Sequence, residues 1–322
     1  MPSRRTLIAS ALGAFLPLAY AQQAATRVVR VGLFANTPEP QWEAFRRTLR
    51  EHGWVEGRNL VIEERWMMGD ARKAAELAKS LVVLEPDVLV ASSSTQTEAL
   101  RSLTSKIPIV FLLHADPVGA GHVASMARPG GNITGLSQLM TEVSAKMLQM
   151  LHEAVPRAMR IGVLWNPSTP THPAALKAID SAIERLGLRA VMAEAKSAEE
   201  LPSAFATLTR ERVEALLVVP SPLAFRERAR LAELCLAHRI PGMFGFRQNV
   251  EAGGLVSYGV DIQDQIARAA VFVDRILRGA KPADLPVEQA MKFELAINTK
   301  TASTLGVAVP QAVLMRADKL VD

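Results

Sequence analysis

The sequence predicts an α/β protein built from two doubly wound lobes, each with a parallel sheet. From residue 28 onward, short runs rich in Val, Ile and Leu alternate with longer segments of helical period, which is the pattern of a parallel sheet covered by helices. The two halves also resemble each other, because residues 87–92 and 214–221 are both apolar runs that end in serine. Each run is followed by a helical segment and then by Ile-Pro. Chance similarity between two generic α/β segments is the alternative, and it leaves the fold class unchanged.

The expected elements follow from the length and period of the apolar segments. In the first half, strands are expected at residues 28–35, 59–66, 87–91, 107–113 and 133–136, with helices at 40–52, 71–84 and 95–104. In the second half, strands are expected at 160–165, 189–193, 215–219, 242–246 and 255–258, with helices at 171–186, 198–211, 223–238 and 262–278.

The first 21 residues have the layout of a cleavable secretory signal. Arg4 and Arg5 precede an apolar stretch at residues 7–18, which ends in the small-x-small site Ala19-Tyr20-Ala21. This stretch is shorter than the roughly 20 apolar residues that span a bilayer. The expected location is therefore the periplasm, with cleavage after Ala21. The paired arginines satisfy part of the twin-arginine pattern, so the general secretory route and the twin-arginine route both stay open.

Composition excludes several classes of protein. The only cysteine, Cys235, cannot form an internal disulfide, so the hydrophobic core alone must hold the 301 residues that remain after residues 1–21 are removed. The charge of +5 falls to +3 without Arg4 and Arg5, and the remaining basic residues are scattered among acidic ones. Nothing predicts nucleic-acid binding. The six histidines lack metal-ligand spacing and no catalytic or dinucleotide motif is present, so we expect no enzyme, no metal and no cofactor.

Candidate ligand-binding residues lie where strands end. Ligands of open α/β sheets bind beyond the carboxyl ends of the strands, which in a two-lobed protein face a shared cleft. The richest such end is the run from Ser92 through Ser93 and Ser94 to Thr95, whose hydroxyls and helix N-terminus suit a carboxylate or another anionic group. A simple N-cap is the alternative, and one residue suffices for a cap.

Other strand ends supply further candidates. Asp116 follows the strand expected at 107–113, and Asn166 and Ser168 follow the strand at 160–165. Ordinary turn chemistry is the alternative for these residues. Weaker candidates close later strands, namely Ser221, Phe246 and Asp261.

Several motifs together resemble a known family. They are Glu-Pro-Asp-Val-Leu-Val at 85–90, Asp-Pro-Val-Gly-Ala-Gly at 116–121, Ala-Arg-Pro-Gly-Gly-Asn-Ile-Thr-Gly at 127–135 and Gly-Gly-Leu-Val-Ser-Tyr-Gly at 253–259. Over nearly its full length the chain resembles the ABC-transporter substrate-binding proteins of the tryptophan/tyrosine-importer type. The resemblance implies a type I periplasmic-binding-protein fold with three crossovers and no catalysis.

The resemblance also implies a pocket formed by Ser93, Ser94, Thr95, Asp116, Asn166 and Ser168. The sequence departs from the family after Ser168, where Thr-Pro-Thr-His occupies 169–172, and at Ser137-Gln138, where the family often has Ser-Asp. Ser137 therefore joins the candidate ligand-binding residues, and the nature of the ligand stays open.

These observations predict an exported, monomeric solute-binding protein that captures a small polar or amino-acid-like ligand between its lobes and delivers it to an ABC permease in the inner membrane. A periplasmic protein that presents its ligand to a membrane receptor is the alternative. Lobe 1 is expected to comprise residues 28–137 plus 262–285, and lobe 2 residues 138–261 plus 286–322. Hinges are expected near 137–141, 259–262 and 284–287, where they absorb the closure of the lobes.

Overall fold

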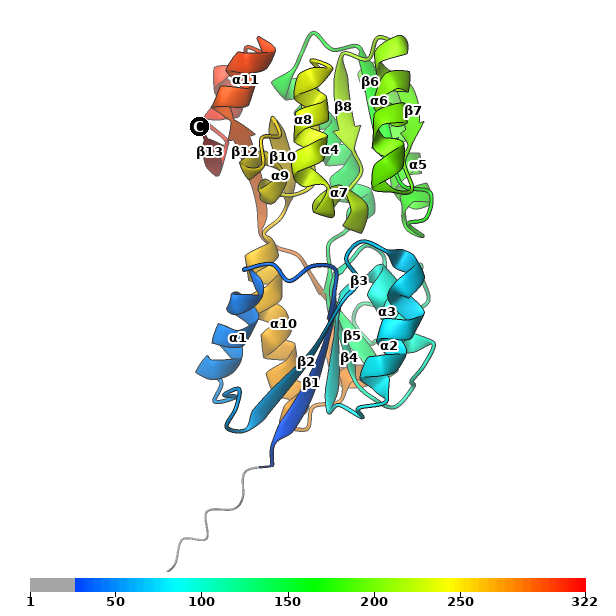
Figure 1. Ribbon diagram of the computed structural model, residues 1–322, viewed down its shortest axis with the longest axis vertical. Coiled ribbons are helices and arrows are strands. Elements are labelled where there is room, and N and C mark those ends of the chain that lie inside the picture. The colour runs from blue at the N-terminus through cyan, green and yellow to red at the C-terminus, as the bar shows by residue number, and fades with distance from the viewer. Residues whose placement is uncertain (1–26) are drawn as a thin grey trace, which may run out of the picture.

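The computed structural model describes residues 27–322, so the predicted signal at residues 1–21 lies outside the described residues. Two α/β lobes lie one above the other along the long axis of the molecule (Figure 1). Each lobe has its own sheet with helices on both faces, which confirms the predicted fold class. No helix within residues 27–322 is long and apolar enough to cross a bilayer.

The first lobe is built on a six-stranded parallel sheet in the order β11-β5-β4-β3-β1-β2. Its strands are β1 (Val29–Ala35), β2 (Leu60–Trp66), β3 (Val88–Ser93), β4 (Ile109–His114), β5 (Ile133–Ser137) and β11 (Glu288–Gln289). Its helices are α1 (Trp42–Glu51), α2 (Ala74–Val82), α3 (Ser94–Arg101) and α10 (Ile262–Leu277), with short 3₁₀ turns at Ala71–Lys73 and Pro282–Asp284. Helices α1 and α10 cover one face of the sheet, and α2 and α3 cover the other.

The second lobe has a seven-stranded sheet in the order β13-β12-β10-β9-β8-β6-β7, parallel except between β10 and β12. Its strands are β6 (Arg160–Trp165), β7 (Arg189–Glu194), β8 (Ala215–Val218), β9 (Gly242–Phe244), β10 (Val256–Val260), β12 (Phe293–Asn298) and β13 (Lys319–Val321). Its helices are α4 (Met140–Ala154), α5 (His172–Leu186), α6 (Leu201–Arg210), α7 (Pro222–Arg226), α8 (Arg228–Ala237), α9 (Arg247–Glu251), α11 (Thr299–Leu305) and α12 (Gln311–Leu314), with a 3₁₀ turn at Ala198–Glu200.

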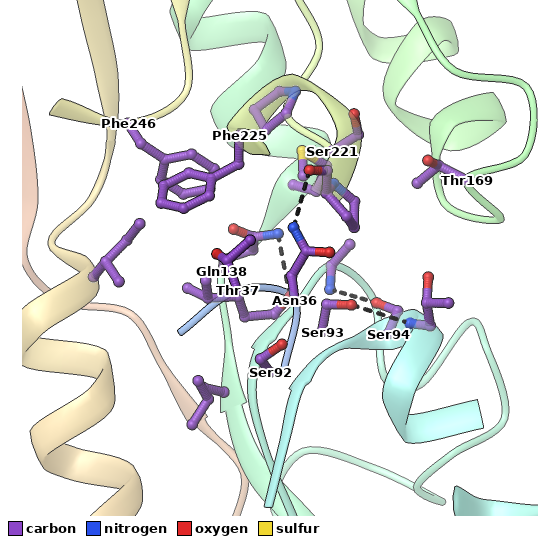
Figure 2. A pocket seen from close by; sticks show the side chains of 18 of the residues that line it. Asn36, Thr37, Ser92, Ser93, Ser94, Gln138, Thr169, Ser221, Phe225 and Phe246 are labelled. Carbon is purple, nitrogen blue, oxygen red and sulfur yellow. Dashed lines mark hydrogen bonds between the residues drawn. The ribbon is translucent and has the colours of Figure 1, made fainter. Parts of the chain in front are cut away.

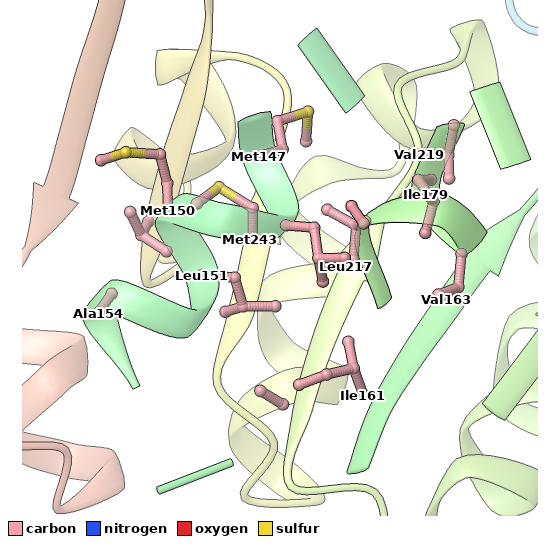
Figure 3. Packing of buried hydrophobic residues seen from close by; sticks show 14 of the residues in the cluster. Met147, Met150, Leu151, Ala154, Ile161, Val163, Ile179, Leu217, Val219 and Met243 are labelled. Carbon is pink, nitrogen blue, oxygen red and sulfur yellow. The ribbon is translucent and has the colours of Figure 1, made fainter. Parts of the chain in front are cut away.

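Helix α4 is the largest element that the sequence analysis did not predict. Its buried face includes Met147, Met150 and Leu151, which pack on the sheet of the second lobe beside Met243 and Ile161 (Figure 3). This face is apolar but has no regular run of branched residues, because flexible methionine side chains fill the irregular gaps. The helix begins three residues after β5 ends, and it carries the chain from the first lobe into the second.

The chain crosses between the lobes three times. The first crossing lies between β5 and α4 and the second between β10 and α10. The third lies between β11 and β12, because Glu288 and Gln289 pair with Leu136 and Ser137 of the first sheet. The first lobe therefore extends to residue 289 rather than to the expected residue 285.

Candidate functional site: an inter-lobe cleft

A cleft that encloses about 800 Å³, open solvent included, lies between the lobes at the carboxyl ends of their parallel strands (Figure 2). Both lobes contribute to its lining. Within the described part of the chain, the lining contains no Asp, Glu, Lys, Arg or His side chain. Recognition in this cleft therefore depends on hydroxyls, amides, backbone groups and apolar surface.

The first lobe supplies most of the polar lining. Hydroxyl and amide groups come from the ends of β1, β3 and β5, with the residues Asn36, Thr37, Ser92, Ser93, Ser94, Thr95 and Gln138. The N-terminus of α3 lies among them, so its first backbone N–H groups and the positive end of its dipole face the same region. This end of the cleft suits an anionic or strongly hydrogen-bonding group.

Apolar side chains form the other part of the lining. Phe225 of α7 and Phe246, which follows β9, meet edge to face with their ring centroids 5.6 Å apart. Ile262 and Ile266 from α10 line the cleft beside them, together with Trp42 at the start of α1. The cleft thus has a polar end and an apolar wall, which is the lining that an amphipathic ligand requires.

The lobes contact each other along one side of the cleft. The Asn36 side-chain amide donates a hydrogen bond to the Pro222 carbonyl at 3.2 Å, and it accepts one from the Gly69 backbone N–H at 2.7 Å. The Arg228 guanidinium pairs with the Glu39 carboxylate at 3.1 Å. These bonds join the loop after β1 to α7 and α8, so the two lobes are already linked across the cleft.

We call residues 92–95 the Ser/Thr turn. Its hydroxyls both cap helix α3 and line the cleft. The Ser93 hydroxyl accepts a hydrogen bond from the Thr95 backbone N–H at 3.3 Å, so it is the N-cap of α3. The Ser94 hydroxyl instead accepts from the Ala115 backbone N–H at 3.1 Å and lies 3.2 Å from Nδ1 of His114. Both residues line the cleft, but they are fixed by different partners (Figure 2).

The predicted site residues fall into two groups. Those in the cleft lining are Ser93, Ser94, Thr95, Ser221 and Phe246. The others, which lie outside that lining, are Asp116, Ser137, Asn166, Ser168 and Asp261.

Asp116 accepts from the Gly119 backbone N–H at 2.8 Å, and Asn166 accepts from the Ser168 backbone N–H at 2.8 Å. These are the bonds that the turn interpretation expects. Ser168 itself is exposed. Ser137 is buried and accepts from the Leu139 N–H at 3.4 Å.

Asp261 is the N-cap of α10 and also pairs with Lys292 at 2.6 Å. Burial works against its ionisation, but hydrogen bonds led by that from Lys292 outweigh burial and lower its pKa. Asp261 therefore fixes the start of α10 at the second crossing between the lobes.

The sequence analysis missed several lining residues. Asn36 and Thr37 follow β1 directly, so the strand-end rule applied to the first strand would have found them. Phe225 gave no such signal because it lies within α7 and reaches the cleft only through the packing of the two lobes.

Replacing Ser93 and Ser94 separately by alanine is expected to separate capping from ligand binding. Ser93→Ala removes the N-cap of α3 and should lower the free energy of unfolding by about 1 kcal/mol. Ser94→Ala removes a polar group from the cleft and should weaken ligand binding by about tenfold. Thermal denaturation and titration of the two variants measure these effects. Wild-type affinity in Ser94→Ala would mean that the Ser94 hydroxyl has no role in binding.

The two α/β lobes, the three crossings between them and the inter-lobe cleft define the type I periplasmic-binding-protein fold. The sequence matches the family model described as ABC transporter substrate binding protein over residues 39–321, so the chain belongs to that family.

Relatives and solved structures agree with this assignment. The chain is 24% identical to the tyrosine-binding protein of Clostridioides difficile over 263 residues, which cover 82% of this chain and 75% of that protein. A conserved domain protein from Vibrio cholerae has a TM-score of 0.84 at 28% identity, covering 91% of this chain and 100% of that one. An ABC domain from Streptococcus pneumoniae, in complex with L-Trp, has a TM-score of 0.83 at 24% identity, covering 91% and 99%.

Proposed function

We propose that this protein captures an amino acid with an aromatic side chain in its inter-lobe cleft and delivers it to an ABC permease. The observation that carries the proposal is the division of the cleft into a polar end at the Ser/Thr turn and an apolar wall at Phe225 and Phe246. An aromatic amino acid has the same division. The tyrosine-binding protein and the L-Trp complex among the similar proteins support this choice of ligand.

In this proposal the carboxylate of the ligand binds at the N-terminus of α3. The backbone N–H groups of the first turn and the helix dipole stabilise an anion there without a charged side chain. The aromatic ring packs against Phe225 and Phe246, which belong to the second lobe, so the ligand bridges the two lobes. A ligand that contacts both lobes favours their closed arrangement by its differential affinity.

The proposal includes export and transport without catalysis. Residues 1–21 would direct the chain to the periplasm, where a monomer would bind its ligand and dock on the permease in the closed form. Movement would be absorbed at the three crossings, near residues 137–141, 259–262 and 289–293. The third range replaces the expected 284–287, because Glu288 and Gln289 still pair with the first sheet.

Thermal-shift measurements on the purified protein test the choice of ligand. The panel contains L-tryptophan, L-tyrosine, L-phenylalanine, uncharged sugars, nucleosides and simple carboxylates. We expect the aromatic amino acids to raise the melting temperature, since a ligand that binds only the native state stabilises it. Stabilisation by a sugar or nucleoside alone would overturn the proposed ligand class, and hydrolysis of any panel compound would overturn the binding function.

A further inference from the structure

Behind the cleft, a chain of buried hydrogen bonds runs from Ser94 to the surface. The Ser94 hydroxyl lies 3.2 Å from Nδ1 of His114, and Nε2 of His114 lies 2.6 Å from Nδ1 of His122. Nε2 of His122 lies 2.6 Å from a carboxylate oxygen of Glu98. The His114 side chain is fully buried and that of His122 is 4% exposed, while Glu98 reaches the surface. We call Ser94, His114, His122 and Glu98 the histidine relay.

Glu98 determines which atom donates and which accepts in each hydrogen bond of the histidine relay. Its carboxylate forms a two-point ion pair with Arg101, at 3.1 and 3.2 Å. Burial opposes ionisation, but the hydrogen bonds from Arg101 and His122 outweigh it and lower the pKa of Glu98. An ionised carboxylate can only accept hydrogen bonds, so the facing Nε2 of His122 must carry a proton.

The direction then passes from ring to ring toward the cleft. With its proton on Nε2, a neutral His122 accepts at Nδ1, so His114 must donate from its own Nε2. Nδ1 of His114 is left as an acceptor, and the Ser94 hydroxyl donates its proton to it. Burial, with a smaller contribution from His122, lowers the pKa of His114 to about 3, which keeps this ring neutral.

A serine oxygen has one proton and two lone pairs. In Ser94 the proton points to His114, and one lone pair accepts the hydrogen bond from the Ala115 backbone N–H at 3.1 Å. The second lone pair is left for the cleft, which Ser94 lines. A ligand at this point therefore meets an acceptor and must bring a donor.

We propose that His114 and His122 are positioning residues that orient the Ser94 hydroxyl, so that its oxygen accepts a hydrogen bond from an ammonium group of the ligand. This inference rests on the proposed function and extends it, because it identifies how an ammonium group is recognised in a cleft whose lining has no acidic side chain among the described residues. The ammonium group of an amino acid lies next to its carboxylate. Ser94 is the first residue of α3, so its hydroxyl lies next to the helix N-terminus at which the carboxylate is proposed to bind.

The first test measures the tautomers without any ligand. Long-range proton–nitrogen NMR correlations of the ¹⁵N-labelled protein at pH 8 show which ring nitrogen carries the proton. The signals are assigned by their loss in His114→Gln and His122→Gln. We expect the proton on Nε2 in both rings. A proton on Nδ1 of His114 at this pH would overturn the proposal, even if L-tryptophan binds.

The second test compares L-tryptophan with indole-3-propionate, which lacks the ammonium group. At pH 8 the wild-type protein should prefer L-tryptophan by about tenfold or more. In His122→Gln, the amide oxygen can accept from His114 and the amide nitrogen can donate to Glu98, so this variant should keep the preference. His122→Leu has neither group and should lose most of it.

A matched control is His238→Gln, which changes a histidine that contacts Thr209 in the second lobe. It should leave the preference unchanged. An undiminished preference in His122→Leu, or no preference in the wild type that binds L-tryptophan, would overturn the positioning role. Failure of the wild type to bind L-tryptophan would instead count against the proposed function, while the tautomer measurement would still decide the direction of the histidine relay.

Discussion

Phe225→Ala is expected to lower the affinity for an aromatic amino acid by about thirtyfold, which corresponds to about 2 kcal/mol. Phe225 lines the cleft from the second lobe and packs edge to face on Phe246. Truncation removes apolar contact with the ligand and also exposes the neighbouring ring to water. Titration calorimetry with L-tryptophan measures the loss.

The control for this prediction is Phe205→Leu, a substitution in the core of the second lobe. Phe205 is fully buried in the cluster around α6, and no atom of it lines the cleft. Its replacement should reduce stability and leave affinity within about twofold of the wild type. If Phe205→Leu weakened binding as much as Phe225→Ala, the loss would reflect general destabilisation rather than contact with the ligand.

Gly259→Ala is expected to reduce the free energy of unfolding by about 3 kcal/mol or more. Gly259 lies in β10 just before the second crossing, and a Cβ atom there would lie 1.8 Å from the backbone oxygen of Gly245. A backbone atom cannot move aside as a flexible side chain can, so β10 must shift. Urea denaturation of the variant measures the change.

Gly131→Ala is the matched control for this backbone effect. A Cβ atom at Gly131 has open space within 4 Å, and this glycine lies in an exposed turn. Its free energy of unfolding should change by less than about 0.5 kcal/mol. A small effect at Gly259, equal to that at Gly131, would mean that β10 and the loop after β9 separate readily at the crossing.

The fold was predictable because the sheets are parallel and buried. Strands β1, β3, β4, β6 and β8 are short apolar runs bounded by turns, and the sequence analysis located each of them within a few residues. The segments after residue 286 were not predicted, because β11 has two residues and β12 pairs antiparallel with β10. Their positions depend on tertiary pairing, which hydrophobic period does not encode.

The candidate site was predictable where it follows strand ends and not where it depends on packing. The Ser/Thr turn could be predicted because it directly follows a buried apolar run, and in the structure it lines the cleft. The partners of its hydroxyls were not predictable. His114 was not among the predicted site residues, yet it touches Ser94 because β4 lies beside β3 in the sheet. Phe225 reaches the cleft only because α7 faces the first lobe.

The central claim is that the cleft binds an aromatic amino acid by both its polar end and its apolar wall. Its most direct test is calorimetric titration of the purified protein with L-tryptophan, repeated on Ser94→Ala and Phe225→Ala. We predict saturation at one molecule per chain, with lower affinity in each variant. The account would be contradicted if neither L-tryptophan, L-tyrosine nor L-phenylalanine bound saturably, or if binding were unchanged in both variants.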